Sequence, residues 1–368
     1  MIDGIKLNCH INDFPAWERA TNIETSTPVN LNTGEIKAII QRSKRGNLYK
    51  TITRFGKFET YRINVKEVRN IYDSYEETTA FYFTLDGSLH KNNFGGENYK
   101  PFTWNKLQSQ ICHVETGLCL NSEKVNLVRL EFGVNINLSF PVFNFLQKNL
   151  ISYRGKQFNS YALDRKGLCL GYYCELSEYT VKIYDKGAQY NLPDPLMRFE
   201  LRFKKMRKLN QLGIDTLSDL KNKEKMCRLR GLLLSAWDEV LLFDNSIRID
   251  HVKVKDSERE LLNRGNNPKF WEAEKERLSN PGFHKRKNMF KKLISLYGLK
   301  RHEQIKELIN DEFVRLLNSV DAVIELKKVD NITIKVKDEI VYHDICYLYR
   351  NSGFSPYDFG RVSSMMAA

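Results

Sequence analysis

Strict alternation of apolar and polar side chains over residues 178–208 restricts the fold of this chain more than any other feature. The stretch EYTVKIYDKGAQYNLPDPLMRFELRFKKMRK predicts two strands joined by a loop that contains proline. On the first strand, an apolar face (Tyr179, Val181, Ile183) lies opposite a polar one (Thr180, Lys182, Tyr184, Lys186). On the second strand, Met197, Phe199, Leu201 and Phe203 lie opposite Arg198, Glu200, Arg202 and Lys204. This period of two is typical of half-buried strands, so we expect the polar faces to form an open working surface.

The rest of the chain changes from strands to helices near residue 208. Further strands are predicted at 1–10, 35–55 (a hairpin), 58–65, 79–86 and 125–138, with a polar loop after the first of them. Helices are predicted at 103–116, with Thr103 as its N-cap, and at 141–151. Helices then dominate, at 223–243, 255–264, 268–278, 284–297 and 302–320, before a short strand at 332–341. We expect an α+β fold, in which one mainly antiparallel sheet has helices on its apolar face and a mostly helical C-terminal domain is appended. The expected domains are 1–208 and 209–350, with a loosely ordered tail at 351–368.

The charge of the chain favours a polyanionic partner. Lys and Arg number 58 against 45 Asp and Glu, a net charge of +13. Nucleic acid is the first such partner and an anionic membrane the second, but a basic protein with neither partner fits the charge equally well. No apolar run approaches the roughly 18 residues of a membrane span, and the N-terminal residues lack the layout of a signal peptide. Seven scattered cysteines without zinc-ligand spacing indicate reduced thiols, so we expect a cytoplasmic protein that has no membrane partner.

Three of the predicted strands carry chemistry on their polar faces. Glu131, Tyr184 and Glu200 converge if these strands are neighbours in one sheet. Carboxylate oxygens suit Mg²⁺ or Mn²⁺, which stabilise the charge of a phosphoryl transition state. A tyrosine becomes a nucleophile when cations stabilise its phenolate, and Lys182 and Lys186 flank Tyr184. The alternative interpretation is structural, because alternating Glu, Arg and Lys on strands commonly form cross-strand salt bridges.

A family resemblance favours the catalytic interpretation. RLEFGVNI at 129–136, YTVKIYDKGAQY at 179–190 and LMRFELRFKK at 196–205 resemble strands of plasmid and phage rolling-circle replication initiators of the replication initiation factor type. They are more distantly similar to the filamentous-phage nicking proteins. The resemblance covers roughly residues 1–219 and rests on Lys182-Ile183-Tyr184-Asp185-Lys186 and Arg198-Phe199-Glu200.

The resemblance implies a metal-dependent nicking endonuclease and strand transferase. Such proteins nick one DNA strand at an origin, hold the 5′ phosphate on a tyrosine and later rejoin the ends. By resemblance, Tyr184 is the nucleophile, Lys186 supports the phosphate, and Glu131 and Glu200 bind Mg²⁺ or Mn²⁺ or activate water. Residues 1–208 would then be the nicking and joining domain, and 209–350 a helical DNA-binding or accessory domain. Implied partners are single-stranded or origin duplex DNA, a host helicase and a second copy of the chain.

The chain also departs from the better-known relatives. It has no pair of histidines separated by one hydrophobic residue, which leaves His90 as the one additional ligand considered. It has no pair of tyrosines one helical turn apart, so Tyr190, Tyr172, Tyr173 and Tyr179 stay open as nucleophiles beside Tyr184.

Cations on two regions are candidates for DNA contact. On the strands these are Lys182, Arg198 and Arg202, and on the predicted helix at 284–297 they are Lys285, Arg286, Lys287, Lys291 and Lys292. A solvated helix face explains the second group equally well. The alternative function is therefore a basic DNA-binding protein that recognises an origin or operator without cutting it.

Overall fold

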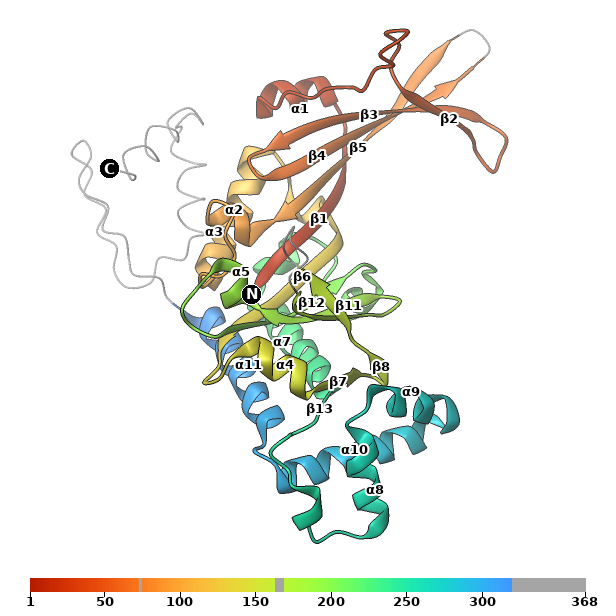
Figure 1. Ribbon diagram of the computed structural model, residues 1–368. Coiled ribbons are helices and arrows are strands. Elements are labelled where there is room, and N and C mark those ends of the chain that lie inside the picture. Colours follow the sequence, from red (N-terminus) through yellow and green to blue (C-terminus); the bar gives the residue numbers. More distant parts are fainter. Residues whose placement is uncertain (73–74, 163–168, 320–368) are drawn as a thin grey trace, which may run out of the picture.

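The computed structural model, which describes residues 1–72, 75–162 and 169–319, combines one large antiparallel sheet with a helical C-terminal region (Figure 1). The α+β class predicted from the sequence is thus confirmed. The strands of the large sheet are β1 (Ile2–Ile11), β2 (Ala38–Arg42), β3 (Leu48–Phe58), β4 (Tyr61–Ile71), β5 (Glu76–Ser88), β6 (Asn126–Asn137), β9 (Asn159–Ala162), β10 (Cys169–Glu175), β11 (Tyr179–Asp185) and β12 (Leu196–Phe203). A small second sheet contains β7 (Leu150–Tyr153), β8 (Lys156–Gln157) and β13 (Val240–Leu242).

The order of the ten strands is β2-β3-β4-β5-β1-β6-β12-β11-β10-β9, and every pair is antiparallel. The three strands that carry Glu131, Tyr184 and Glu200 lie in one sheet, as predicted, and are neighbours in it. Gly133 on β6 permits the close approach of β12, because a Cβ there would lie 2.2 Å from the carbonyl oxygen of Phe199.

Side-chain caps mark the start of several helices. The helices are α1 (Phe14–Thr21), α2 (Leu89–Asn93), α3 (Trp104–Gly117), α4 (Val142–Asn149), α5 (Lys186–Tyr190), α6 (Arg207–Asn210), α7 (Lys223–Asp238), α8 (Asp256–Gly265), α9 (Pro268–Arg277), α10 (Asn280–Tyr297) and α11 (Arg301–Asn318). Thr103 caps α3 as expected, since its hydroxyl accepts from the amide of Lys106. None of the helices in the described ranges is long and apolar enough to cross a membrane.

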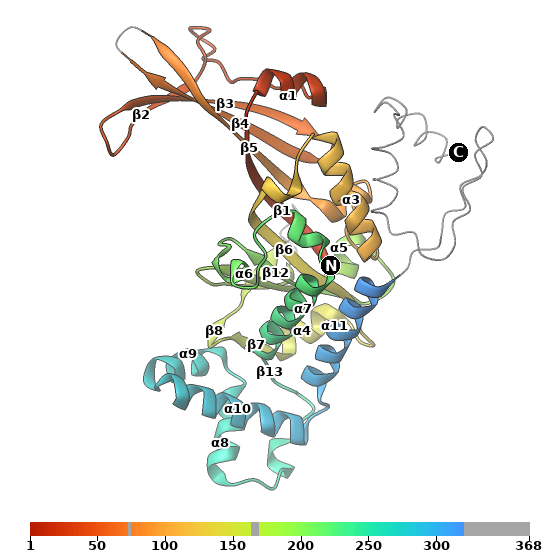
Figure 2. The ribbon, with the colours of Figure 1, turned by 180° about the vertical axis from the view of Figure 1, so that it is seen from behind.

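Two hydrophobic cores hold these elements together. The larger one joins the apolar faces of the central strands to α1, α3, α4, α7 and α11 (Figure 2). The helices predicted at 103–116 and 141–151, now α3 and α4, therefore lie on the apolar face as predicted. The smaller core joins α8, α9 and α10 around Trp271 and Phe290. The molecule is elongated, with the long strands β2–β5 extending at one end and α8–α10 forming the other (Figure 1). The boundary near residue 208 stays a prediction.

Several local predictions differ from the structure. The segment after β1 was expected to be a loop, but α1 begins there because Asp13 caps it and Pro15 occupies its first turn. The helix predicted at 223–243 ends at Asp238, and its last apolar residues form β13 instead. A short apolar run fits either element, and here pairing with β7 decides. Lys186 was expected at the end of a strand, but it begins α5. The strand predicted at 332–341 and the tail at 351–368 lie outside the described residues.

Candidate active site

Three carboxylates from three strands meet on the polar face of the sheet. Asp3 comes from β1, Glu131 from β6 and Glu200 from β12, and one oxygen from each lies within 4.8 Å of the others. The register explains the convergence, because Glu200 pairs with Gly133, two residues along β6 from Glu131. Glu131 and Glu200 were predicted as a pair, and Asp3 is the third member that the sequence did not reveal.

A β-bulge explains why Asp3 was missed. Simple alternation along β1 puts Asp3 on the same face as the buried Ile5 and Leu7. The register between β1 and β6 shifts between Ile2 and Ile5, so the rule of two fails there. Asp3 reaches the polar cluster as a result, and Gly4, a glycine inside the strand at this shift, is the sequence signal that could have marked the bulge.

Two cations, Lys182 on β11 and Arg198 on β12, bind the carboxylates. The ammonium of Lys182 on β11 donates to Glu200 Oε1 at 2.7 Å and to Glu131 Oε1 at 3.0 Å. The guanidinium of Arg198 donates to Asp3 Oδ2 at 3.1 Å, and its Nε binds Glu200 Oε2. Both oxygens of Glu200 are therefore occupied by cations.

Asn98, in the loop after α2, forms a second layer over the cluster. Its amide donates to Asp3 Oδ2 at 2.7 Å, and its carbonyl accepts from the ammonium of Lys186 at 2.6 Å and from the hydroxyl of Tyr190 at 2.8 Å. Asn135 on β6 holds this loop in place, since its amide donates to the carbonyl oxygens of Asn98 and Tyr99. The loop and α5 thus cover this part of the sheet.

The expectation of an open polar face was wrong at the centre of the sheet. Glu200 is 1% exposed, Arg198 and Lys186 are buried, and Lys182 is nearly so. The physical reason is that the polar side chains satisfy one another across the strands and beneath the Asn98 loop, so they can be covered. Glu131 is the most accessible of the three carboxylates, with 14% of its side chain exposed.

Burial and charge separate the pKa values of the two glutamates. Burial and the neighbouring charge of Glu200 raise the pKa of Glu131 to about 7. For Glu200, burial acts to raise the pKa, but Arg198 and Lys182 outweigh it and hold the pKa well below its usual range. Two carboxylates in one site with opposite shifts are an arrangement that acid–base chemistry uses.

Lys186 and His90 lie at the edge of the cluster. Burial, helped by the charge of Arg198, lowers the pKa of Lys186 to about 7. Burial likewise lowers the pKa of His90 to about 3, and its Nε2 is 2.8 Å from the carbonyl oxygen of Lys100. The ring of His90 stacks on Phe102 at 4.9 Å, so this histidine is packed inside the fold rather than solvated.

Three tyrosines surround the cluster and differ in exposure. Tyr184 is 4% exposed, and burial together with Glu200 raises its pKa well above 10. Tyr161 on β9 stands edge-on to Tyr184 at 5.4 Å and has Lys182 at 5.5 Å from its ring centre. Tyr190 lies on α5 with Lys186 at 5.0 Å from its ring centre. Tyr161 and Tyr190 are both partly exposed, and sequence reasoning did not consider Tyr161 as a nucleophile.

The cations predicted to contact DNA fall into two groups. Arg202 is 40% exposed and lies 3.6 Å from Glu131, and Lys285 and Lys292 on α10 are also exposed. The remaining α10 cations bind within the protein. Arg286 pairs with Glu274 and Lys287 with Glu239, both at 2.8 Å, and Lys291 donates to the carbonyl oxygen of Asp238. Their roles toward DNA stay predictions.

The carboxylate cluster can hold a metal ion. Three carboxylates are hard oxygen donors of the kind that Mg²⁺ and Mn²⁺ take, so the donor set fits such an ion. An incoming divalent cation would compete with Lys182 for Glu131 and Glu200, and would bring two positive charges where the ammonium brings one. The identity of the ion stays a prediction.

The cluster does not line a hollow that lies elsewhere in the described residues. That hollow, of about 380 Å³, lies near the turn between β10 and β11, where Arg154, Lys156, Lys208 and Lys275 line it. We assign the site by the chemistry of the carboxylates, because a closed polar cluster has little free volume until a ligand opens it.

Few known proteins are similar to this chain. No family model matches the chain, and no curated protein matches it. One solved structure is similar: the rolling circle replication initiator protein from Geobacillus stearothermophilus. The match has 10% identity and a TM-score of 0.33, and it covers 71% of this chain and 89% of that one. That protein is of the kind that the strand motifs resemble. At this identity and score, we base the function on the residues of the site.

Proposed function

We propose that the chain is a metal-dependent DNA nicking and joining enzyme that acts through a phosphotyrosine intermediate. The observation that carries the proposal is the meeting of Asp3, Glu131 and Glu200 within 4.8 Å on adjacent strands. Two of these residues stand in the strands that resemble rolling-circle initiators, and the third was found by geometry. The bound ion, Mg²⁺ or Mn²⁺, would supply charge stabilisation to the phosphoryl group.

Each residue of the cluster has a distinct task. Asp3, Glu131 and Glu200 would hold the ion, and Lys182 would balance their charge when the ion is absent. Arg198 fixes Glu200 and Asp3 in place, since it donates to both. Lys186, whose pKa is about 7, can change its charge near neutral pH and so can both support a phosphate and carry a proton.

The covalent step conserves atoms and charge. The phenol oxygen of the nucleophile forms a bond to phosphorus, and the bond from phosphorus to the 3′ oxygen breaks. The phenol proton passes to the neutral amine of Lys186, and the 3′ oxygen leaves with a proton from the resulting ammonium. Rejoining is the reverse, in which a 3′ hydroxyl attacks the phosphotyrosine and releases the phenol.

Tyr184 is the nucleophile in the sequence-based proposal, but it is buried, so the reaction requires that the cluster opens. The hydroxyl of Tyr184 must become accessible when DNA and the ion enter, because the Asn98 loop and α5 cover the cluster. Tyr161 and Tyr190 need less movement, since both are partly exposed. Residues 1–208 carry this chemistry in the proposal, and 209–350 form the helical accessory part.

Covalent capture of DNA tests the proposal. The purified protein and Mn²⁺ are incubated with single-stranded candidate origin DNA, and a protein–DNA adduct is sought on a denaturing gel. We expect an adduct with the wild type and with Tyr190→Phe, and none with Tyr184→Phe. If Tyr161→Phe or Tyr190→Phe loses the adduct while Tyr184→Phe keeps it, the reaction stands and the nucleophile changes. A wild type that binds the DNA tightly but never forms an adduct rejects the enzyme.

A non-catalytic DNA-binding protein is the second candidate, and one observation favours it. Both oxygens of Glu200 are bound by cations in the present structure, as in a purely structural ion-pair network. In that case divalent ions would not bind the cluster, and Glu200→Gln would change stability without changing any reaction on DNA.

A further inference from the structure

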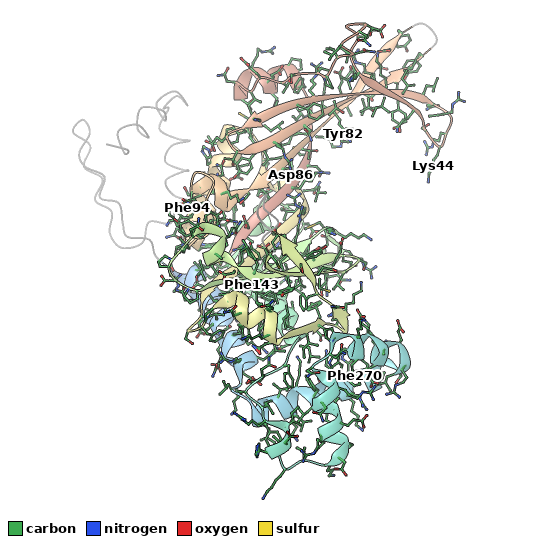
Figure 3. All side chains as sticks on the ribbon, viewed as in Figure 1. Lys44, Tyr82, Asp86, Phe94, Phe143 and Phe270 are labelled. Atoms are coloured by element: carbon green, nitrogen blue, oxygen red, sulfur yellow. The ribbon has the colours of Figure 1, made fainter. Side chains whose placement is uncertain are left out.

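The positive charge of the chain is concentrated in its long strands. Residues 36–71, which span β2, β3 and β4, contain ten Lys and Arg but only two Glu. This segment alone carries +8 of the net +13. It forms one end of the elongated molecule, where the strands extend beyond α1 and Lys44 lies at the tip of the β2–β3 hairpin (Figure 3). A charge this dense needs either internal partners or an anionic ligand.

The face toward α1 has internal partners. On that side Lys50 pairs with Glu76 at 3.0 Å, and Arg54 and Arg69 pair with the buried Glu67 at 3.2 and 2.6 Å. These ion pairs stabilise the extended sheet where the hydrophobic core ends. These three cations are therefore accounted for within the fold, whereas Arg42, which shares this face on β2, is exposed.

The opposite face, which continues the polar face of the site, lacks such pairing. Lys57 and Lys66 are exposed, and no carboxylate in the described ranges pairs with either. Arg62 is 74% exposed and lies 3.7 Å from Asp86, whose oxygens already bind Arg129 at 2.7 and 3.2 Å. We call Lys57, Arg62 and Lys66 the outer cations.

The register of the strands leads from the outer cations to the carboxylates. Lys57 pairs with Arg62, Arg62 with Asp86, Asp86 with Lys6, and Lys6 with Arg129. This row crosses five strands, about 19 Å at roughly 4.8 Å per step. It ends on β6 two residues before Glu131, on the same face of that strand.

Aromatic rings stand beside this row. Tyr82, 43% exposed, pairs across the strands with both Lys66 and His10, and its ring lies 4.4 Å from that of His10 (Figure 3 labels Tyr82 and Asp86). Phe55 on β3 is 47% exposed on the same face, between Lys57 and Thr53. Exposed rings beside exposed cations are the composition of a surface that stacks bases and neutralises phosphates.

We infer that this outer face of β1 and β3–β5 binds single-stranded DNA and guides it to the carboxylate cluster. The inference rests on the proposed function, which supplies the reason for a DNA strand to reach Glu131. Single-stranded DNA fits better than duplex, because only unpaired bases can stack on Tyr82 and Phe55. A second copy of the chain fits poorly, since two faces with this charge would repel each other.

Salt-dependent binding tests the surface in the full-length protein. Affinity for a labelled oligothymidylate is measured at several salt concentrations for the wild type and the triple variant Lys57→Gln, Arg62→Gln, Lys66→Gln. Three lost phosphate contacts should lower the slope of log affinity against log salt by about 2, at roughly 0.7 per contact for a single strand. Tyr82→Leu should weaken binding about tenfold without changing the slope.

A matched control removes the same charge elsewhere. Arg248→Gln, Lys253→Gln, Lys269→Gln replaces one Arg and two Lys that are also exposed, in the helical region, and should leave the slope unchanged. Equal slopes for the wild type and the outer-cation variant would overturn the inference, as would equal losses in the two triple variants. A loss for duplex DNA as large as for the single strand would overturn the choice of ligand.

The adduct assay separates this inference from the proposed function. The outer-cation variant should still form the covalent adduct once the DNA concentration saturates it, because its carboxylates and tyrosines are intact. If the wild type forms no adduct but the salt slopes differ as expected, the binding surface stands and the enzyme fails. If the adduct forms and the slopes are equal, the enzyme stands and this surface is rejected.

Discussion

One face of the large sheet contains two polar regions that differ in burial and in ion pairing. At the centre, the carboxylates and cations of β1, β6, β11 and β12 are buried and bind one another. Toward the extended end, Lys57, Arg62 and Lys66 are exposed with little or no pairing. Both regions come from the same alternating pattern, so the pattern determines which face is polar but not whether that face is covered.

The balance of charge explains the difference. The centre combines three carboxylates with Lys182 and Arg198, which permits a closed network in which each group has a partner. The extended end has an excess of cations that no nearby carboxylate matches. A closed network suits the precise holding of reactive groups, and an open excess of charge suits the capture of a polyanion.

The largest expected effect on stability is at the centre. Arg198→Met removes the partner of Glu200 and Asp3 and leaves two buried charges without it, which should cost about 3–5 kcal/mol in the free energy of unfolding. Urea denaturation followed by circular dichroism measures this cost. The matched exposed substitution, Arg62→Met, should change it by less than about 0.5 kcal/mol. Similar costs for the two variants would remove the distinction between the regions.

A pH-dependent effect should sharpen the same distinction. The folded protein raises the pKa of Glu131 from 4.5 to about 7, so the folded state binds more protons than the unfolded state between these values. Stability of the wild type should therefore fall, relative to Glu131→Gln, as the pH rises from 4.5 to 7. The expected change is about 1–3 kcal/mol, at about 1.4 kcal/mol per pKa unit. Glu276→Gln, at an exposed position on α9, should follow the wild type at every pH.

The smallest effect is expected from the basic helix α10. Three of its five cations bind Glu274, Glu239 and the carbonyl oxygen of Asp238, which leaves Lys285 and Lys292 exposed. Replacing both with Gln should change the slope of log affinity against log salt for duplex DNA by less than about 0.9, the value for one phosphate contact. A larger change would place duplex DNA on α10 and restore the sequence-based prediction for this helix.

Much of the fold could be predicted from the sequence because its signals are local. Alternation in β6, β11 and β12 predicted three strands of one sheet with Glu131 and Glu200 on polar faces, and the two glutamates meet because the strands are neighbours. Helical spacing and the Thr103 cap predicted α3. Each of these signals lies within one element and is read by a period of 2 or 3.6 residues.

What the sequence did not reveal depends on contacts between distant segments. Asp3 joins the site through a bulge between β1 and β6, and the bulge breaks the period on which prediction relied. The cover over the cluster depends on Asn98 meeting Lys186 and Tyr190, more than 85 residues apart along the chain. Tyr161 reaches Lys182 only because β9 lies two strands away in the sheet.

Binding of Mn²⁺ tests most directly whether the closed centre is a metal site and the open end is not. Isothermal titration calorimetry at neutral pH compares the wild type, Glu131→Gln and the outer-cation triple variant, without DNA. We predict Mn²⁺ binding by the wild type, affinity at least about tenfold lower in Glu131→Gln because a charged ligand is lost, and unchanged affinity in the triple variant. A wild type that binds no Mn²⁺, or a Glu131→Gln variant that binds it as tightly as the wild type, would contradict the metal site.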